Sequence, residues 1–540
     1  MRGIASLALV AALLTLAQTP TVVANPRGSG SARLSLVEAT VDDLLKAIQT
    51  GLVTIEQLTE MYLARIAAYD DAGPGVNALL HVNANAAEQA AALDAARHPG
   101  IARSPLYGIP ILLKDNIDTA DMPTTAGSVA LNGSIPPDDA FITRKLRAAG
   151  AVIIGKATLT EFANFIALGM PTGYSSLGLF GFNPYDPRPL PGGDGRPVLQ
   201  TGGSSSGSGI GVNANLAALA IGTETSGSIL SPASANGVVG IKPTVGLVSR
   251  DGIIPITADQ DTAGPITRTV RDAAILLGVI AGHDPNDAAT DACLEPGNCF
   301  SNYTQFLNPK ALQGARIAVP PFPANRADIM NNAIDVLESL GAEVVLIPAL
   351  APQLGSCVAY PYPAGCSTVL LYGQKRDLNA YLANTPGSPM ANIAEIVAFN
   401  ATYVPPMKYG QAIFEAAAMQ DTSPGSADTA RYLADRAEDL ARSRGALDAV
   451  YAEFDAILAS ANNFASTPAK AGYPSITVPG GFLPPAPPIV NPFPSGVTFS
   501  GPAFSEPKLI GYAYAFEQAT KYRVPPASTP PLPSDTVTRR

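Results

Sequence analysis

Two serine- and glycine-rich segments, residues 202–209 and 225–229, hold the residues best suited to chemistry in this chain of 540 residues. They read GGSSSGSG and TSGSI, and an apolar, alanine-rich run separates them. Glycine turns let several backbone N–H groups point at one spot, and small residues let a substrate approach closely. Such a loop can stabilise the oxyanion formed when a serine attacks a carbonyl carbon.

The two segments resemble the signature of the amidase signature family, whose members hydrolyse C–N bonds with a Ser–cis-Ser–Lys triad. Ser204 in GGSS and Ser228 in TSGSI are 24 residues apart, which is the family's separation. The family's lysine, at the end of an apolar strand, matches Lys114 in GIPILLKDN. The resemblance implies that Ser228 forms an acyl-enzyme, and that Ser204 carries protons between Ser228 and Lys114.

The same resemblance assigns the oxyanion hole to the backbone N–H groups of Thr225, Ser226, Gly227 and Ser228. Lys114 must be neutral to act as a base, although an exposed lysine has a pKa of about 10.4. Burial at the end of an apolar strand is expected to lower that pKa. Adjacent Asp115 is expected to point to the opposite face of the strand. The implied chemistry uses no metal and no organic cofactor.

The segment around Ser228 departs from the common family pattern. It reads GTETSGSIL where many members read GTDTGGSIR, so Glu224 keeps the carboxylate while Leu230 replaces an arginine. Together with the C-terminal SEPKLI, these variants look most like the bacterial peptide amidase branch, which deamidates peptide C-termini. The expected partner is therefore a small-molecule or peptide amide. Aryl-acylamide, carbamate or ester cleavage, and non-catalytic binding, are the alternatives.

Two other motifs are rejected as sites. Residues 203–207 fit GxSxG, which would make Ser205 the nucleophile of an α/β-hydrolase. That fold needs a later histidine, and only His283, in a segment typical of a surface turn, follows the serine. GAVIIGKA at residues 150–157 approaches the phosphate-binding GxxxxGK[ST], but it ends in alanine and reads as a strand.

The surrounding elements predict an α/β fold. From Leu106, short apolar strands alternate with helices, which indicates a sheet covered on both faces, and the resemblance implies a large, mixed, twisted sheet. A helix is expected after Thr40, and Thr54 with Gln57 predicts a capping box for a second. One amidase domain is expected over residues 36–525. Glycine- and proline-rich loops at 169–200 and 484–502 are expected to border the site.

The chain ends have their own signals. Residues 1–24 carry Arg2, a short apolar run and small residues, which describes a secretory signal peptide. The run is too short for a comfortable membrane span, so a secreted or periplasmic protein without stable membrane insertion is expected. Residues 25–35 are predicted to be flexible and residues 526–540 to be disordered.

Cysteine usage and charge complete the expectations. Cys293 with Cys299, and Cys357 with Cys366, could each close a local disulfide in an oxidising compartment. Four cysteines permit about three connectivities, so these pairs are favoured rather than fixed. The spacings do not suit zinc. The net charge of −10 and the lack of a basic cluster argue against nucleic acid as a partner. Nothing in the sequence indicates the oligomeric state.

Overall fold

The computed structural model describes residues 32–97, 104–350, 367–402 and 407–539. The predicted signal peptide at residues 1–24 lies outside this range, as does the predicted pair Cys357–Cys366.

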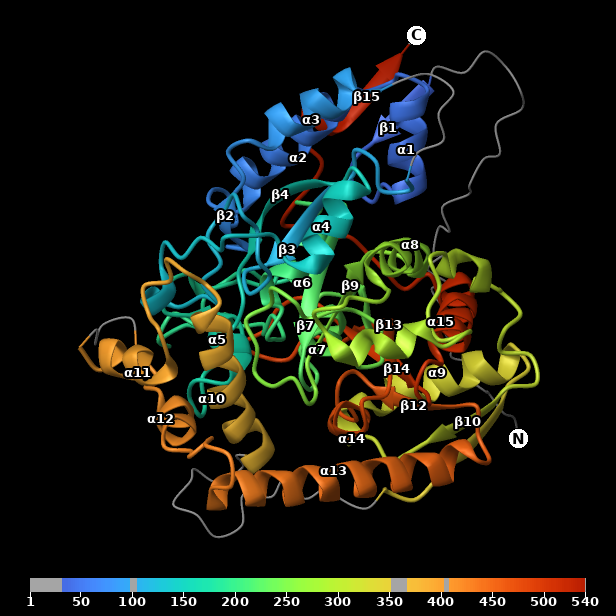
Figure 1. Ribbon diagram of the computed structural model, residues 1–540. Helices are drawn as coiled ribbons and strands as arrows, with labels where there is room; N and C mark the ends of the chain where they lie inside the picture. Colours follow the sequence, from blue (N-terminus) through green and yellow to red (C-terminus); the bar gives the residue numbers. More distant parts are fainter. Residues whose placement is uncertain (1–31, 98–103, 351–366, 403–406, 540) are drawn as a thin grey trace, which may run out of the picture.

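One sheet of eleven strands runs through the described part of the chain (Figure 1). Its strands, in spatial order, are β11 (Glu343–Leu346), β10 (Arg316–Val319), β12 (Ala456–Ser460), β14 (Phe493–Ser500), β13 (Ser475–Leu483), β8 (Val239–Lys242), β9 (Thr262–Thr267), β7 (Leu219–Glu224), β3 (Pro110–Lys114), β4 (Val152–Ala157) and β2 (Leu79–Val82). β7, β3 and β4 are parallel to one another, whereas β9 runs antiparallel to β7. The predicted mixed sheet is confirmed.

Every residue of the neighbouring strands β7, β3 and β4 is buried. Such continuous burial is expected where helices cover a parallel sheet on both faces, because no strand face then meets water. Any polar side chain on these strands must find its partners inside the protein. Lys114, the last residue of β3, is one of them.

Helices pack on both faces of the sheet (Figure 1). The described helices are α1 (Val41–Gln49), α2 (Ile55–Tyr69), α3 (Ala86–Ala95), α4 (Phe141–Ala148), α5 (Glu161–Asn164), α6 (Ser206–Asn213), α7 (Leu230–Ala235), α8 (Val270–Ile280), α9 (Ala327–Ser339), α10 (Thr368–Ala383), α11 (Ile393–Thr402), α12 (Ala412–Ala418), α13 (Ala427–Tyr451), α14 (Ser466–Ala471) and α15 (Glu506–Thr520). The predicted capping box of Thr54 and Gln57 is confirmed at the start of α2. α6 packs closely on the sheet, because a Cβ at its Gly207 would lie only 2.2 Å from the carbonyl oxygen of Ala78.

Helices α10, α11 and α12 pack against the loops on one side of the sheet. They share a second apolar cluster with the segment from Ala126 to Phe180. Within this cluster, the ring centroids of Phe162 and Phe414 lie 4.5 Å apart. The predicted loop at 169–200 belongs to this region and contains a short hairpin of β5 (Tyr174–Ser175) and β6 (Leu179–Phe180). These helices therefore lie beside the loops that follow strands such as β3, where Tyr381 of α10 contacts Asp118.

The C-terminal segment is ordered over residues 526–539, so the predicted disorder of residues 526–540 is wrong for these residues, and residue 540 lies outside the described range. β15 (Thr536–Arg539) pairs antiparallel with β1 (Ala32–Ser35), which also corrects the predicted flexibility of residues 32–35. The physical reason is Arg65 of α2, which is fully buried. Its guanidinium contacts Asp535 at 2.5 Å and donates to the carbonyl oxygens of Pro530 and Thr529. The composition of the tail gave no sign of this distant charge.

We expect Asp535→Ala to lower the free energy of unfolding by about 3–5 kcal/mol, because it leaves a buried guanidinium without its counter-ion. Urea unfolding of the two proteins measures the difference. Asp42→Ala is the matched control, since the Asp42–Arg271 pair is exposed and should cost less than about 1 kcal/mol. If the two variants lost the same free energy of unfolding, the Arg65–Asp535 pair would not be what holds the C-terminal segment in place.

The structure joins Cys293 to Cys299, with Cα atoms 5.0 Å apart. Cys293 is the last but one residue of the 3₁₀ helix η2 (Ala288–Leu294) and packs against the main core. The bond closes the small loop that the turn-forming residues between the two cysteines predict.

Candidate active site

Lys114, Ser204 and Ser228 come from three segments that meet at the carboxyl ends of β3 and β7. Because β3 and β7 are adjacent and parallel, Lys114 at the end of β3 and the loop that follows β7 lie at the same edge. Ser204 lies just before α6, and Ser228 lies between β7 and α7. The peptide bond between Gly203 and Ser204 is cis, as the resemblance implies. The residues singled out in the sequence are thus gathered in one region.

Lys114 is buried and has three acceptors for its amino group. Its Nζ lies 2.8 Å from Ser204 Oγ, 2.8 Å from Thr223 Oγ1 and 3.2 Å from Thr223 O. Burial lowers the pKa of Lys114 from 10.5 to about 7, although the negative charges of Asp261 and Glu224 act in the opposite direction. A substantial fraction of Lys114 is therefore neutral near pH 7 and able to accept a proton.

The carboxylate next to Lys114 faces away from it, which confirms the sequence prediction. Asp115 lies 3.5 Å from Lys156 Nζ, and it accepts hydrogen bonds from the backbone and the hydroxyl of Thr125. Lys156 is the lysine of the segment that resembles a phosphate-binding motif. It lies inside β4 with no exposed surface, so this segment is a core strand and not a nucleotide loop.

Ser228 keeps 8% of its surface exposed, whereas Ser204 and Ser205 are fully buried. The backbone N–H of Ser205 donates to the carbonyl oxygen of Ser228 over 3.1 Å, which fixes the two serine segments side by side. In the described part of the chain, no hydrogen bond joins the hydroxyls of Ser228 and Ser204. The structure therefore shows the Lys114–Ser204 contact directly, with Ser228 beside them as the least buried of the three serines.

The hydroxyl of the alternative nucleophile, Ser205, is occupied by hydrogen bonds to the protein backbone. Its hydroxyl donates to Thr223 O over 3.1 Å and accepts from Thr223 N over 3.2 Å. His283, the histidine that this alternative requires, instead contacts Asp291 on a partly exposed surface. These contacts support the rejection of an α/β-hydrolase site.

Glu224 shapes the loop that carries Ser228. Its buried carboxylate accepts hydrogen bonds from the N–H groups of Gly227 (2.6 Å), Ile229 (2.8 Å) and Leu230 (3.1 Å). Gly227 has φ of 83°, a left-handed conformation that favours glycine. The Gly227 N–H thus points at Glu224 and not at a substrate. Among the described residues, the other three N–H groups assigned to the oxyanion hole, those of Thr225, Ser226 and Ser228, have no protein acceptor.

Three residues of the site escaped the sequence analysis: Thr223, Asn116 and Asp261. The Nδ2 of Asn116 donates to Thr223 Oγ1 over 3.1 Å, so both residues support the amino group of Lys114. Asp261, just before β9, accepts a hydrogen bond from the Thr225 hydroxyl. Asn116 and Thr223 lie inside quoted motifs and could have been noticed there. Asp261 has no such signal, because only strand pairing brings it to the site.

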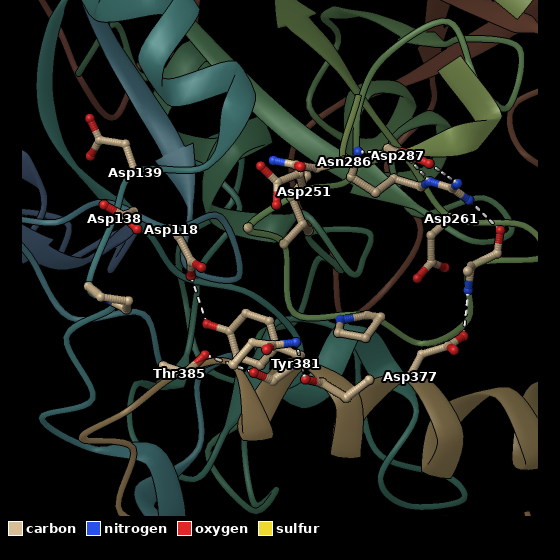
Figure 2. Close-up of a pocket in the computed structure, with 18 of the residues that line it drawn as sticks. Asp118, Asp138, Asp139, Asp251, Asp261, Asn286, Asp287, Asp377, Tyr381 and Thr385 are labelled. Carbon is tan, nitrogen blue, oxygen red and sulfur yellow. Dashed lines mark hydrogen bonds and ion pairs between the residues drawn. The ribbon is translucent and has the colours of Figure 1, made fainter. Parts of the chain in front are cut away.

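Two cavities lie beside these residues. A small one is lined by Asn116, Thr223, Thr225 and Asp261, among others. Asp261 also lines a larger cavity of about 500 Å³. Figure 2 shows its wall, with Asp118 bonded to Tyr381 of α10 and with further aspartates around it. The lining contains seven aspartates, Asp118, Asp138, Asp139, Asp251, Asp261, Asp287 and Asp377, but only two arginines, Arg144 and Arg250. Arg250 is itself paired with Asp287, so the cavity has a negative character.

No group of three or more His, Cys, Asp or Glu side chains in the described ranges is arranged to hold a metal ion. Within the same ranges, no helix has both the length and the apolar character needed to cross a bilayer.

Known proteins of the same kind match most of this chain. A family model described as Amidase matches residues 57–510. A probable amidase of Arabidopsis thaliana is 39% identical over 511 residues, which cover 92% of this chain and 93% of that protein. The crystal structure of native peptide amidase from Stenotrophomonas maltophilia is 39% identical, with a TM-score of 0.81 over 91% of this chain and 99% of that one. A complex of peptide amidase with the competitive inhibitor chymostatin has 40% identity and a TM-score of 0.79, over 91% of this chain and 99% of that one.

These matches agree with the geometry: a buried lysine beside a serine, a second serine on a neighbouring glycine loop, and an eleven-stranded mixed sheet that holds them. The chain therefore belongs to the amidase signature family and is an amide-hydrolysing enzyme.

Proposed function

We propose that this enzyme removes the C-terminal carboxamide of peptides through an acyl-enzyme on Ser228. The observation that carries the proposal is the fully buried amino group of Lys114, 2.8 Å from Ser204 Oγ, with a pKa of about 7. A serine hydroxyl becomes a strong nucleophile only when a nearby base takes its proton. Lys114 meets this requirement near neutral pH.

In the proposed reaction, Ser228 Oγ attacks the amide carbon while its proton passes to Ser204, whose own proton passes to neutral Lys114. The tetrahedral intermediate collapses when the C–N bond breaks, and the Lys114 ammonium returns a proton through Ser204 to the leaving nitrogen. Ammonia leaves. Water then attacks the ester by the same route and releases the acid and Ser228. Each half-reaction returns Lys114 to its neutral form, so protons balance.

The oxyanion would be held by the backbone N–H groups of Thr225, Ser226 and Ser228, which have no other acceptor among the described residues. The loss of one such donor typically slows an acyl transfer by about 10²–10³-fold. Glu224 supports this arrangement indirectly. By accepting from both sides of Ser228, it fixes the turn from which the free N–H groups project.

Peptide amides are favoured as substrates because two solved structures with 39–40% identity are of peptide amidase, one of them with a competitive inhibitor bound. Aryl-acylamides, carbamates and esters can react through the same acyl-enzyme, so they remain the alternative substrates. A non-catalytic binder is disfavoured by the intact set of Lys114, Ser204 and Ser228.

We also propose that the enzyme acts outside the cytoplasm, after removal of the signal peptide at residues 1–24. A disulfide between Cys293 and Cys299 fits an oxidising compartment. The mass of the mature protein in culture fluid or periplasm tests this point directly. A protein that stays in the cytoplasm with residues 1–24 attached would contradict it.

The experiment that tests the reaction is ammonia release from a panel of peptide C-terminal amides, with an anilide, a carbamate and an ester alongside. Ammonia from the peptide amides supports the proposal. Cleavage of only the anilide, carbamate or ester would keep the chemistry but overturn the substrate, and no turnover of any compound would favour the binder.

A further inference from the structure

Asp261 connects Thr225, in the loop that carries Ser228, to the neighbouring turn at Ile256 and Thr257. One carboxylate oxygen accepts from the Thr225 hydroxyl over 2.5 Å. The other accepts from the N–H groups of Ile256 (2.8 Å) and Thr257 (2.9 Å). Asp261 precedes β9, whose first residue, Thr262, pairs with Glu224 at the end of β7. The carboxylate therefore bridges the loop after β7 and the turn at Ile256 and Thr257.

Thr225 is the residue through which Asp261 affects the backbone N–H groups beside Ser228. It is the first residue after β7, and its backbone N–H is the first of the free donors beside Ser228. Its side chain is nearly buried, and its carbonyl oxygen accepts from Gln260 Nε2 over 3.3 Å. Both ends of Thr225 are thus held by the segment that contains Asp261. A shift of the carboxylate would turn the Thr225 peptide and move its N–H.

Asp261 also acts on Lys114 through its charge. It is the largest of the negative influences that favour the ammonium form of Lys114, ahead of Glu224. Burial raises the pKa of Asp261 itself to about 7, while Thr225, the two backbone N–H groups and the charge of Arg250 oppose that rise. The charged groups to be considered around Asp261 are therefore Lys114, Glu224 and Arg250. Figure 2 shows Asp261 on the wall of the acidic cavity.

We propose that Asp261 is a positioning residue for amide hydrolysis, which holds the Thr225 N–H in place to receive the oxyanion and sets the charge balance at Lys114. This inference rests on the proposed acyl-enzyme function. Asp261 does not touch the reacting atoms. It holds Thr225 through a hydrogen bond, and its negative charge favours the ammonium form of Lys114.

The test is the pH dependence of kcat and KM for Asp261→Asn, Thr225→Val, Thr225→Ser and Asp138→Asn, with the substrate that the wild-type enzyme hydrolyses fastest. Asp261→Asn should lower kcat by about 10- to 100-fold with little change in KM, since a misplaced group costs about this much. The acidic limb of its rate–pH profile, where the rate rises as Lys114 loses its proton, should move to lower pH. The reason is that the loss of the negative charge of Asp261 disfavours the Lys114 ammonium.

The other variants separate the two roles. Thr225→Val keeps the Asp261 carboxylate, so it should lower kcat and move the limb less than Asp261→Asn does, whereas Thr225→Ser keeps the hydroxyl and should restore most of the activity. The double variant Asp261→Asn/Thr225→Val should be no slower than Asp261→Asn alone, since the two changes break one contact. Asp138→Asn removes a charge from the same cavity wall without touching the loop, and it should change nothing.

The proposal is overturned if Asp261→Asn keeps kcat within about twofold of wild type, if the losses from Asp261→Asn and Thr225→Val multiply, or if Asp138→Asn has the same effect as Asp261→Asn. A Ser228→Ala variant measured in parallel keeps the two claims apart. Activity in Ser228→Ala would contradict the acyl-enzyme itself, whereas an inactive Ser228→Ala beside an unaffected Asp261→Asn would contradict only the positioning role.

Discussion

Ser228→Ala should abolish turnover, with kcat reduced by about 10⁶-fold, because the hydroxyl that forms the acyl-enzyme is gone. Ammonia release from a peptide amide measures the loss. A serine-directed covalent probe should label the wild-type protein and leave the variant unlabelled. The fold should survive, since Ser228 contacts the neighbouring serine segment through its backbone and not its hydroxyl.

His283→Ala is the matched control for this prediction. Among the described residues, the polar partner of the His283 ring is the exposed Asp291 side chain, so the loss of His283 should leave kcat and KM unchanged. If His283→Ala were inactive while Lys114→Ala stayed active, the serine–lysine assignment would be wrong.

The second large effect concerns Lys114. Because burial lowers its pKa to about 7, kcat/KM should rise with pH through this region as Lys114 loses its proton, and fall on acidification as the base becomes ammonium. Lys114→Met should lower kcat by about 10³-fold and remove this limb. Initial rates between pH 5 and pH 9 measure both effects.

Lys114→Arg distinguishes a base from a fixed positive charge. Arginine cannot lose its proton in a protein, so this variant should be as inactive as Lys114→Met. Lys242→Met is the control, because Lys242 is also buried, with its pKa lowered to about 8, yet it donates to Tyr473 O rather than to a serine. Activity in Lys114→Arg, or loss of the acid limb in Lys242→Met, would contradict the role given to Lys114.

The sequence was sufficient for the residues that a local motif carries. Lys114, Ser204 and Ser228 stand in short segments with diagnostic glycines and spacing, and the structure brings those segments together. The alternation of strands and helices likewise predicted a sheet covered by helices on both faces. Both signals are local in sequence, which is why they could be read without coordinates.

What the sequence did not reveal depends on contacts between distant segments. Gly227 was assigned to the oxyanion hole, but Glu224 takes its N–H, and only the loop conformation shows this. Asp261 reaches Thr225 because β9 pairs with β7. The C-terminal tail has the composition of a disordered segment, yet it is ordered by Arg65, a charge that must be neutralised in the core.

The partnership of Arg65 with Asp535 sets an order of events during biosynthesis. The two residues are 470 positions apart, which at roughly 5–20 residues per second places their synthesis on the order of half a minute to a minute and a half apart. Throughout that time α2 carries a charge without its final neighbour, and β1 has no strand to pair with. The molecule therefore closes only after Asp535 and β15 have left the ribosome, and a chain that stops before them leaves α2 and β1 without these partners.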